Sequence, residues 1–211
     1  MDIMVSETFD AALIGEKFLS ILVHAKSSGI LKPDATIIPH SAIIHAQLME
    51  STLSLPLGNS SRYNKDFYAS NGRFNLEPMR RFRPSGVYTV RYLNEANAVR
   101  QRISPIYPMF KYDFQNYNIS KARFDYRCLI FNVTLAKEGL VDSIGLWFSL
   151  YLDKEKKLVL SNSPESPSCW MQSLFRLSDD LYVKRGDFLR IQVVQFLDVY
   201  IFGEVSMKFE Y

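Results

Sequence analysis

The sequence has few cysteines and no long apolar segment. Only Cys128 and Cys169 occur among the 211 residues, too few for the disulfide framework of a small secreted protein. No apolar run reaches about 18 residues, so no transmembrane helix is predicted. The first residues lack the positive region and apolar stretch of a signal peptide. We therefore expect an intracellular protein, cytoplasmic or nuclear, with no membrane partner.

Histidines are equally scarce, and they occur only at His24, His40 and His45. Their spacing relative to the two cysteines matches no zinc-binding pattern, so no metal site is predicted. No local motif supports a Ser-His-Asp or Cys-His catalytic arrangement. We interpret all three histidines as structural.

A strong excess of positive charge is also missing. The 25 Lys and Arg residues against 22 Asp and Glu give a net charge of +3, which is too small to indicate nucleic acid binding. One basic cluster, formed by Arg80, Arg81 and Arg83 around Phe82, resembles the basic and aromatic mixtures of single-strand binders. A solvated face or an intramolecular contact explains so short a cluster better, so we predict no nucleic acid partner.

Aromatic residues, by contrast, are abundant. They make up 14% of the chain, with 15 Phe and 12 Tyr, and they favour β-structure. From Ser41 onward, apolar positions recur with period two, in the runs Ile44–Leu48, Phe110–Phe114, Ile144–Leu152, Phe188–Phe196 and Val199–Phe209. Successive β runs without helices between them predict an antiparallel barrel or sandwich. The periodicity fails between Thr52 and Tyr107, which indicates a functional segment, a flexible one or a solvated loop.

The first forty residues follow a different pattern. Asp2–Ser6 and Ala35–Ile38 predict strands, and Leu13–Ala25 predicts a helix between them. Gly29 is the expected helix stop. This strand–helix–strand unit resembles the tail of a doubly wound, Rossmann-like sheet. Because its strands lack further neighbours, we expect it to be mobile or to self-associate. The expected fold class is α+β: this tail followed by a mainly antiparallel β-barrel.

Two acids, Glu7 and Glu16, flank the loop between the first strand and the helix. They are nine positions apart, which places them on opposite faces of either a helix or a strand. The two carboxylates can meet only if the chain bends back between them. A pair of carboxylates suits a planar guanidinium, which offers five N–H donors and stays charged. The alternative is two unrelated acids near a helix N-terminus.

Ser6-Glu7 and Gly15-Glu16, separated by seven residues, resemble the double-glutamate loop of the protein arginine N-methyltransferases. The expected helix and the segments Leu31–Pro39 and Ala42–Ser51 also resemble that family, in particular its tandem-module members, the seventh and the ninth. The resemblance implies methyl transfer from S-adenosylmethionine to an arginine of a protein substrate, with Glu7 and Glu16 as catalytic residues that hold the guanidinium.

The same resemblance implies a division of the chain. Residues 1–40 would be the end of the cofactor-binding domain, and residues 41–211 the β-barrel substrate domain. The irregular segment 52–107 would be a dimerisation arm, so the expected partner is a second copy or another methyltransferase module. Either the irregular segment serves this purpose, or it is a solvated loop.

Trp170 is the candidate substrate-binding aromatic. Trp170 and Gln172 match the family's Thr-His-Trp loop, in which a Gln follows the Trp by two positions, while Ser168 and Cys169 replace the Thr and the His. A thiol is a weak hydrogen-bond donor, so the contact that His makes in the family is in doubt here. Trp170 either stacks on the substrate guanidinium or is a core or rim aromatic.

One family motif is missing. The sequence contains no Gly-x-Gly, whereas the family binds S-adenosylmethionine through a glycine-rich loop after the first strand. The cofactor-binding residues are therefore unknown. The sequence resembles the C-terminal part of a methyltransferase. The rival interpretation is a non-catalytic β-barrel module that pairs with a full-length methyltransferase.

The missing glycine loop generates a prediction about the cofactor. We expect this chain alone to bind S-adenosylmethionine only weakly, because the backbone cradle for the cofactor is absent from the sequence. Titration calorimetry tests this, and a dissociation constant in the low micromolar range would contradict it.

Overall fold

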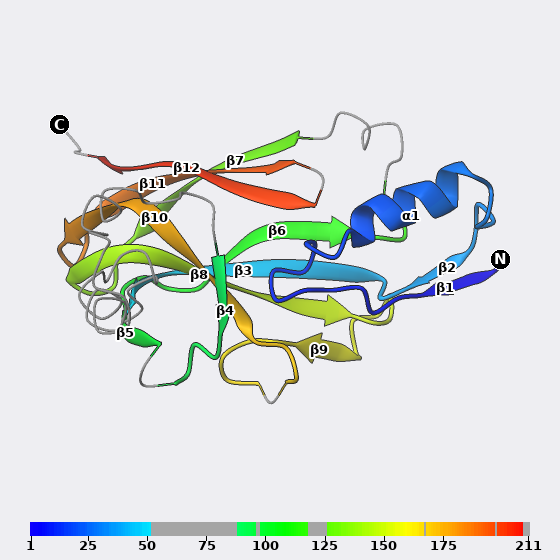
Figure 1. The fold of residues 1–211 in the computed structure, drawn as a ribbon, viewed down its shortest axis with the longest axis horizontal. Coiled ribbons are helices and arrows are strands. Elements are labelled where there is room, and N and C mark those ends of the chain that lie inside the picture. Colours follow the sequence, from blue (N-terminus) through cyan, green and yellow to red (C-terminus); the bar gives the residue numbers. More distant parts are fainter. Residues whose placement is uncertain (52–87, 96–97, 118–125, 167, 197, 209–211) are drawn as a thin grey trace, which may run out of the picture.

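A computed structural model describes residues 1–51, 88–95, 98–117, 126–166, 168–196 and 198–208. These residues contain a single helix and twelve strands, and Figure 1 shows the helix with the first two strands gathered at one end of the β-structure. The elements are β1 (Ile3–Val5), α1 (Phe18–Ser27), β2 (Thr36–Ile38), β3 (Ser41–Ser51), β4 (Tyr88–Arg91), β5 (Val99–Arg102), β6 (Tyr107–Asp113), β7 (Tyr126–Thr134), β8 (Gly139–Tyr151), β9 (Val159–Ser161), β10 (Gln172–Val183), β11 (Phe188–Phe196) and β12 (Val199–Lys208).

Strands β1 and β2 are parallel, with α1 as the crossover between them. The helix buries Phe18, Leu19, Leu22 and Ala25, which are spaced for one helical face. It ends where Gly29 takes a φ of +71°, a conformation that glycine adopts without steric cost. The predicted strand–helix–strand order and the predicted stop at Gly29 are therefore confirmed.

The predicted start of the helix at Leu13 is wrong. The helix begins at Phe18, because Lys17 has a φ of 65° and Leu13 a φ of 80°, both outside the helical region. Leu13 and Ile14 are fully buried all the same. Their apolar spacing therefore reflects burial of turns against the core, and Glu16 precedes the helix instead of opening it.

Two antiparallel sheets form the curled, barrel-like body and confirm the expected fold class. The larger sheet has the order β4-β10-β8-β3-β5, with β6 added on β3 and β9 on β8. The smaller sheet has the order β12-β11-β7. Strands β4 and β5 lie within the range 52–107, in which no strand is predicted, because each is only four residues long and carries too little periodic signal. The rest of the arm-like segment, residues 52–87, lies outside the described residues.

The first forty residues share a hydrophobic core with the body. The ring of Phe18 lies 4.7 Å from the ring of Phe9 and 4.8 Å from that of Phe114, which follows β6. These rings belong to one continuous cluster that extends through β3, β8 and β11. A common core argues against the expected independent mobility of residues 1–40, since the unit would lose most of its burial on detaching.

The outer edge of β2 is closed by a side chain of the body. The Gln115 Oε1 accepts the Ile37 N–H at 3.0 Å, and its Nε2 donates to the Ala35 carbonyl at 2.8 Å. This amide makes the two bonds that a neighbouring strand would make. In the partner strand β1, the side chains of Ile3 and Val5 are 58% and 72% exposed.

The shared core predicts cooperative unfolding. Replacing the fully buried Phe18 by Ala should lower the free energy of unfolding by about 3–5 kcal/mol. The matched control is Ile21→Ala on the exposed side of α1, which should change it by only about 0.5 kcal/mol. Denaturant unfolding followed by tryptophan fluorescence and by circular dichroism checks both changes. Two separate transitions in the native protein would contradict the common core.

Candidate functional site

The loop between β1 and α1 carries both predicted catalytic residues. Ser6 donates its backbone N–H to the carbonyl of Ile38 at 3.0 Å, which fixes the end of β1 against the end of β2. Glu7 follows directly, at the carboxyl end of a parallel strand, where open α/β sheets place their ligands. Glu16 lies at the other end of the loop, two residues before α1.

Asp10 gives this loop its bend. Its Oδ1 accepts the N–H groups of Ala12 at 3.1 Å and Gly15 at 3.0 Å, and its backbone carbonyl accepts the N–H of Leu13 at 3.0 Å. A Cβ at Gly15 would lie 2.2 Å from the Asp10 Oδ2, closer than non-bonded atoms can approach. Residue 15 must therefore be glycine if the Asp10 carboxylate is to accept these two N–H groups. The chain turns between the two glutamates, as their meeting requires.

Both candidate carboxylates are exposed. Among the described residues, neither Glu7 nor Glu16 makes a side-chain hydrogen bond or an ion pair. Two acceptor groups on a buried, hydrogen-bonded loop are thus open to a ligand that donates hydrogen bonds. Their convergence on a single guanidinium stays a prediction.

Trp170 is half-buried and packs edge-on against Phe148 of β8, with ring centroids 5.5 Å apart and an interplanar angle of 68°. Its backbone N–H donates to the Ser168 Oγ at 3.1 Å. The neighbouring Cys169 is exposed. This packing matches the rim-aromatic alternative, and the stacking of Trp170 on a substrate stays a prediction.

A buried amide network joins the glutamate loop to the Trp170 segment, and sequence reasoning missed its central member, Asn162. The Asn162 Nδ2 donates to the carbonyls of Ala11 and Met171. Gln172 donates from Nε2 to the Asn162 carbonyl at 2.8 Å and accepts the Leu93 N–H at Oε1. The only sequence signal was the Gln172 match to the family, because an isolated Asn after a short apolar run has no distinctive pattern.

Two buried tyrosines lie beneath the same loop. The Tyr112 hydroxyl donates to the Gln195 Oε1 at 2.9 Å, and the Tyr200 hydroxyl lies 2.9 Å from it. Burial raises the pKa of both phenols. For Tyr200, Tyr112 and the negative charge of Asp10 raise the pKa further. The phenols therefore stay protonated at neutral pH and act as hydrogen-bond donors, not as general bases.

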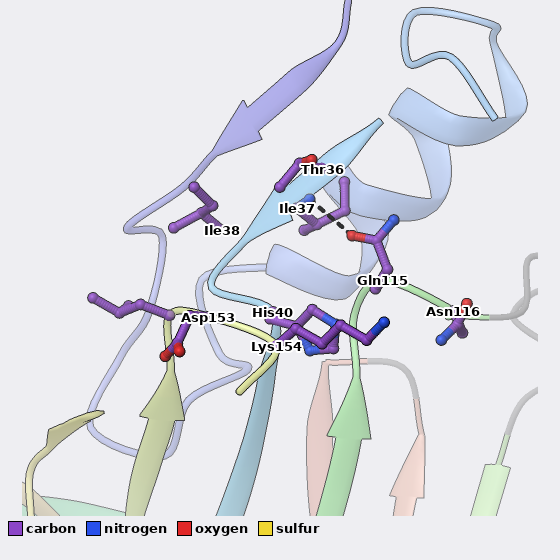
Figure 2. Close-up of a pocket in the computed structure, with 9 residues that line it drawn as sticks. Thr36, Ile37, Ile38, His40, Gln115, Asn116, Asp153 and Lys154 are labelled. Atoms are coloured by element: carbon purple, nitrogen blue, oxygen red, sulfur yellow. Dashed lines mark hydrogen bonds between the residues drawn. The ribbon is translucent and has the colours of Figure 1, made fainter. Parts of the chain in front are cut away.

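A cavity of about 540 Å³ opens where β2 meets the ends of β6 and β8. Figure 2 shows Gln115, His40 and Lys154 among its lining residues, with Gln115 bonded to the backbone at Ile37. The His40 Nδ1 is buried and has no hydrogen-bond partner among the described residues. The cavity borders the glutamate loop through Ile38, whose carbonyl holds Ser6.

The contacts of His45 agree with a structural role. His45 bonds to the Ser149 Oγ at 3.1 Å and lies against Trp147. Burial lowers the pKa of His45, which favours its neutral form. The described part of the chain holds no cluster of His, Cys, Asp and Glu side chains that could bind a metal ion. Within the same residues, no helix is long and apolar enough to cross a membrane.

Two arginine methyltransferases of known activity class are similar to this chain in sequence. The chain is 24% identical to human protein arginine N-methyltransferase 9 over 220 residues, which covers 92% of this chain and 25% of that protein. It is 26% identical to the arginine N(omega)-methyltransferase of Streptomyces achromogenes subsp. streptozoticus, with 92% of this chain and 48% of that protein covered. The chain thus spans between a quarter and a half of these relatives.

A solved structure shares the fold. A chain of the Trypanosoma brucei PRMT1 enzyme–prozyme heterotetrameric complex with AdoHcy superposes with a TM-score of 0.67 at 16% identity, covering 91% of this chain and 57% of the other. The family described as the arginine methyltransferase oligomerization subdomain matches residues 67–210, more than half of the sequence. The chain therefore belongs to the arginine methyltransferases, and most of it is their oligomerization subdomain.

Proposed function

We propose that this chain supplies the guanidinium-binding part of a protein arginine N-methyltransferase. The observation that carries the proposal is the loop from Glu7 to Glu16. Glu7 follows the parallel strand β1, Glu16 precedes α1, and neither carboxylate has a hydrogen-bond or ion-pair partner among the described residues. Asp10, Gly15 and the buried amide of Asn162 hold the loop from below. The relatives named as arginine methyltransferases support the same assignment.

The proposed chemistry is positioning and charge stabilisation. A guanidinium presents its N–H groups in a fixed plane, so two carboxylates can each accept hydrogen bonds from it and fix its orientation. Holding the reacting nitrogen in a fixed orientation lowers the entropic part of the activation barrier for methyl transfer. When that nitrogen gains a methyl group it must lose a proton, and Glu7, Glu16 or a water accepts it.

The methyl donor of the proposed reaction is S-adenosylmethionine, which supplies an electrophilic methyl group. The residues present do not form a complete site for it. Within the described residues, β1 and β2 form a two-stranded sheet, and the side chains of Ile3 and Val5 in β1 are exposed. Donor binding therefore requires residues beyond those described, and we assign no cofactor contact within them.

We infer that a second module, either another copy of this chain or another methyltransferase, supplies the residues that complete the methyl-donor site. The uncovered apolar side chains of β1 support this, since parallel strands are normally paired and covered on both faces. The family description as an oligomerization subdomain and the enzyme–prozyme complex of the structural relative support it as well. The rival is a non-catalytic module that pairs in the same way but whose glutamates take no part in the reaction.

Substitution of the two glutamates distinguishes the proposed catalytic role from the non-catalytic pairing module. Glu7→Gln and Glu16→Gln keep the side-chain shape and remove one charge each. Because a charge-assisted hydrogen bond contributes about 1.5–3 kcal/mol, each change should lower the rate of methyl transfer by at least about tenfold. The measurement is transfer of labelled methyl groups to an arginine-containing peptide by this chain assembled with a cofactor-binding methyltransferase module.

The matched control is Glu155→Gln, an exposed acid in the turn between β8 and β9. It should leave both assembly and turnover unchanged. Unchanged turnover in the Glu7 and Glu16 variants, with assembly intact, would assign the chain to the non-catalytic rival.

A further inference from the structure

Asn162 lies directly after β9, and its side chain is fully buried. Its Oδ1 accepts the Phe148 N–H at 2.6 Å, while its Nδ2 donates to the Ala11 carbonyl at 3.2 Å and to the Met171 carbonyl at 2.8 Å. Its backbone N–H donates to the Phe148 carbonyl at 3.2 Å. Every polar group of this residue is therefore used, which is what a buried amide requires.

These bonds join three segments that are distant in the sequence. Ala11 is in the middle of the loop between Glu7 and Glu16, and it is 151 residues from Asn162. Phe148 belongs to β8, the strand that pairs with both β3 and β10. Met171 directly follows Trp170. A single side chain thus fixes the loop against both the sheet and the aromatic segment.

Only an amide of this size fits the three bonds. Side-chain amides offer one acceptor and two donor hydrogens, whereas a carboxylate offers no donor and a hydroxyl only one. An aspartate at this position would turn an oxygen toward the carbonyls of Ala11 and Met171. Cys169, the neighbour of Trp170, is exposed, so its side chain does not replace the hydrogen bonds that Asn162 makes to Ala11 and Met171.

We propose that Asn162 is the positioning residue of the guanidinium site: it sets the place of the Glu7–Glu16 loop relative to Trp170. This inference rests on the proposed function for its purpose, although the contact itself is independent of it. The Ala11 carbonyl is the point of control, because Asp10 and Ala12 on either side of it take part in the turn that leads to Glu16. Loss of the Asn162 donor frees the centre of the loop while β1 and α1 stay in place.

The test is hydrogen exchange of the loop amides in Asn162→Asp, with Asn162→Ser as a second variant that introduces no buried charge. The amides of Ala12, Leu13 and Gly15 should exchange at least about tenfold faster in both variants. Opening the loop of the native protein breaks the hydrogen bond from Asn162 to the Ala11 carbonyl, and the variants lack this bond, so opening costs them less free energy. The matched control is Asn132→Asp at an exposed position of β7, which should leave exchange unchanged.

The exchange rates are compared with those of β11 amides in the same protein. A purely structural role for Asn162 would accelerate the loop and β11 in proportion, and this outcome would overturn the proposal. Unchanged loop exchange would overturn it too. A selective effect on the loop supports it.

A second readout connects the loop to binding. The dissociation constant for a labelled arginine-containing peptide, measured by fluorescence anisotropy, should rise about fivefold or more in the Asn162 variants at a temperature where they are folded. Binding is measured on the chain assembled with a cofactor-binding methyltransferase module. If this assembly of the native chain binds no peptide while loop exchange still responds selectively, the proposed function fails and the positioning of the loop by Asn162 stands. If the native assembly binds the peptide and the assemblies of the variants bind it equally well, the positioning proposal is wrong.

Discussion

The packing of Phe18 between Phe9 and Phe114 is the contact on which the site depends. The unit of β1, α1 and β2 is too small to bury its own apolar side chains, so it uses the end of the barrel-like body as the other half of its core. Because Phe9 belongs to the loop between Glu7 and Glu16, this packing holds the loop against the barrel-like body at Phe114. The site is therefore a product of the junction and belongs to neither part alone.

The middle of the loop between Glu7 and Glu16 is buried, whereas the two glutamate side chains at its ends are exposed. The Asp10 carboxylate accepts the N–H of Gly15 and the Asn162 amide donates to the carbonyl of Ala11, and these hydrogen bonds offset the usual cost of burying polar backbone atoms. The two glutamates remain in solvent, where an unpaired carboxylate has no desolvation cost. A ligand cation would find two acceptors on a fixed support, which reduces the ordering that binding has to impose.

The sequence predicted the larger features of the fold because they are periodic. Alternation from Ser41 onward identified the β body, and Gly29 identified the end of the helix. The start of the helix was misplaced because Leu13 and Ile14 are buried in turns, where burial imitates helical spacing. Strands β4 and β5 were missed because four residues carry too little alternation to be recognised.

The candidate site divides in the same way. Glu7 and Glu16 are predicted from their resemblance to a family motif and not from spacing, which by itself favours unrelated surface acids. Asn162 could not be found, since its importance comes from a contact 151 residues away. The role of Gln115 at the edge of β2 escaped for the same reason: side-chain contacts between distant segments have no local signal.

The central claim is that Glu7 and Glu16 hold one guanidinium together. Carbon-13 resonances of the glutamate carboxyl groups, followed while an arginine-containing peptide is added, test it most directly. The account predicts that both carboxyl resonances move with a single dissociation constant, and that the same peptide with citrulline in place of arginine moves neither. Movement of only one resonance, or equal movement with citrulline, would contradict the account.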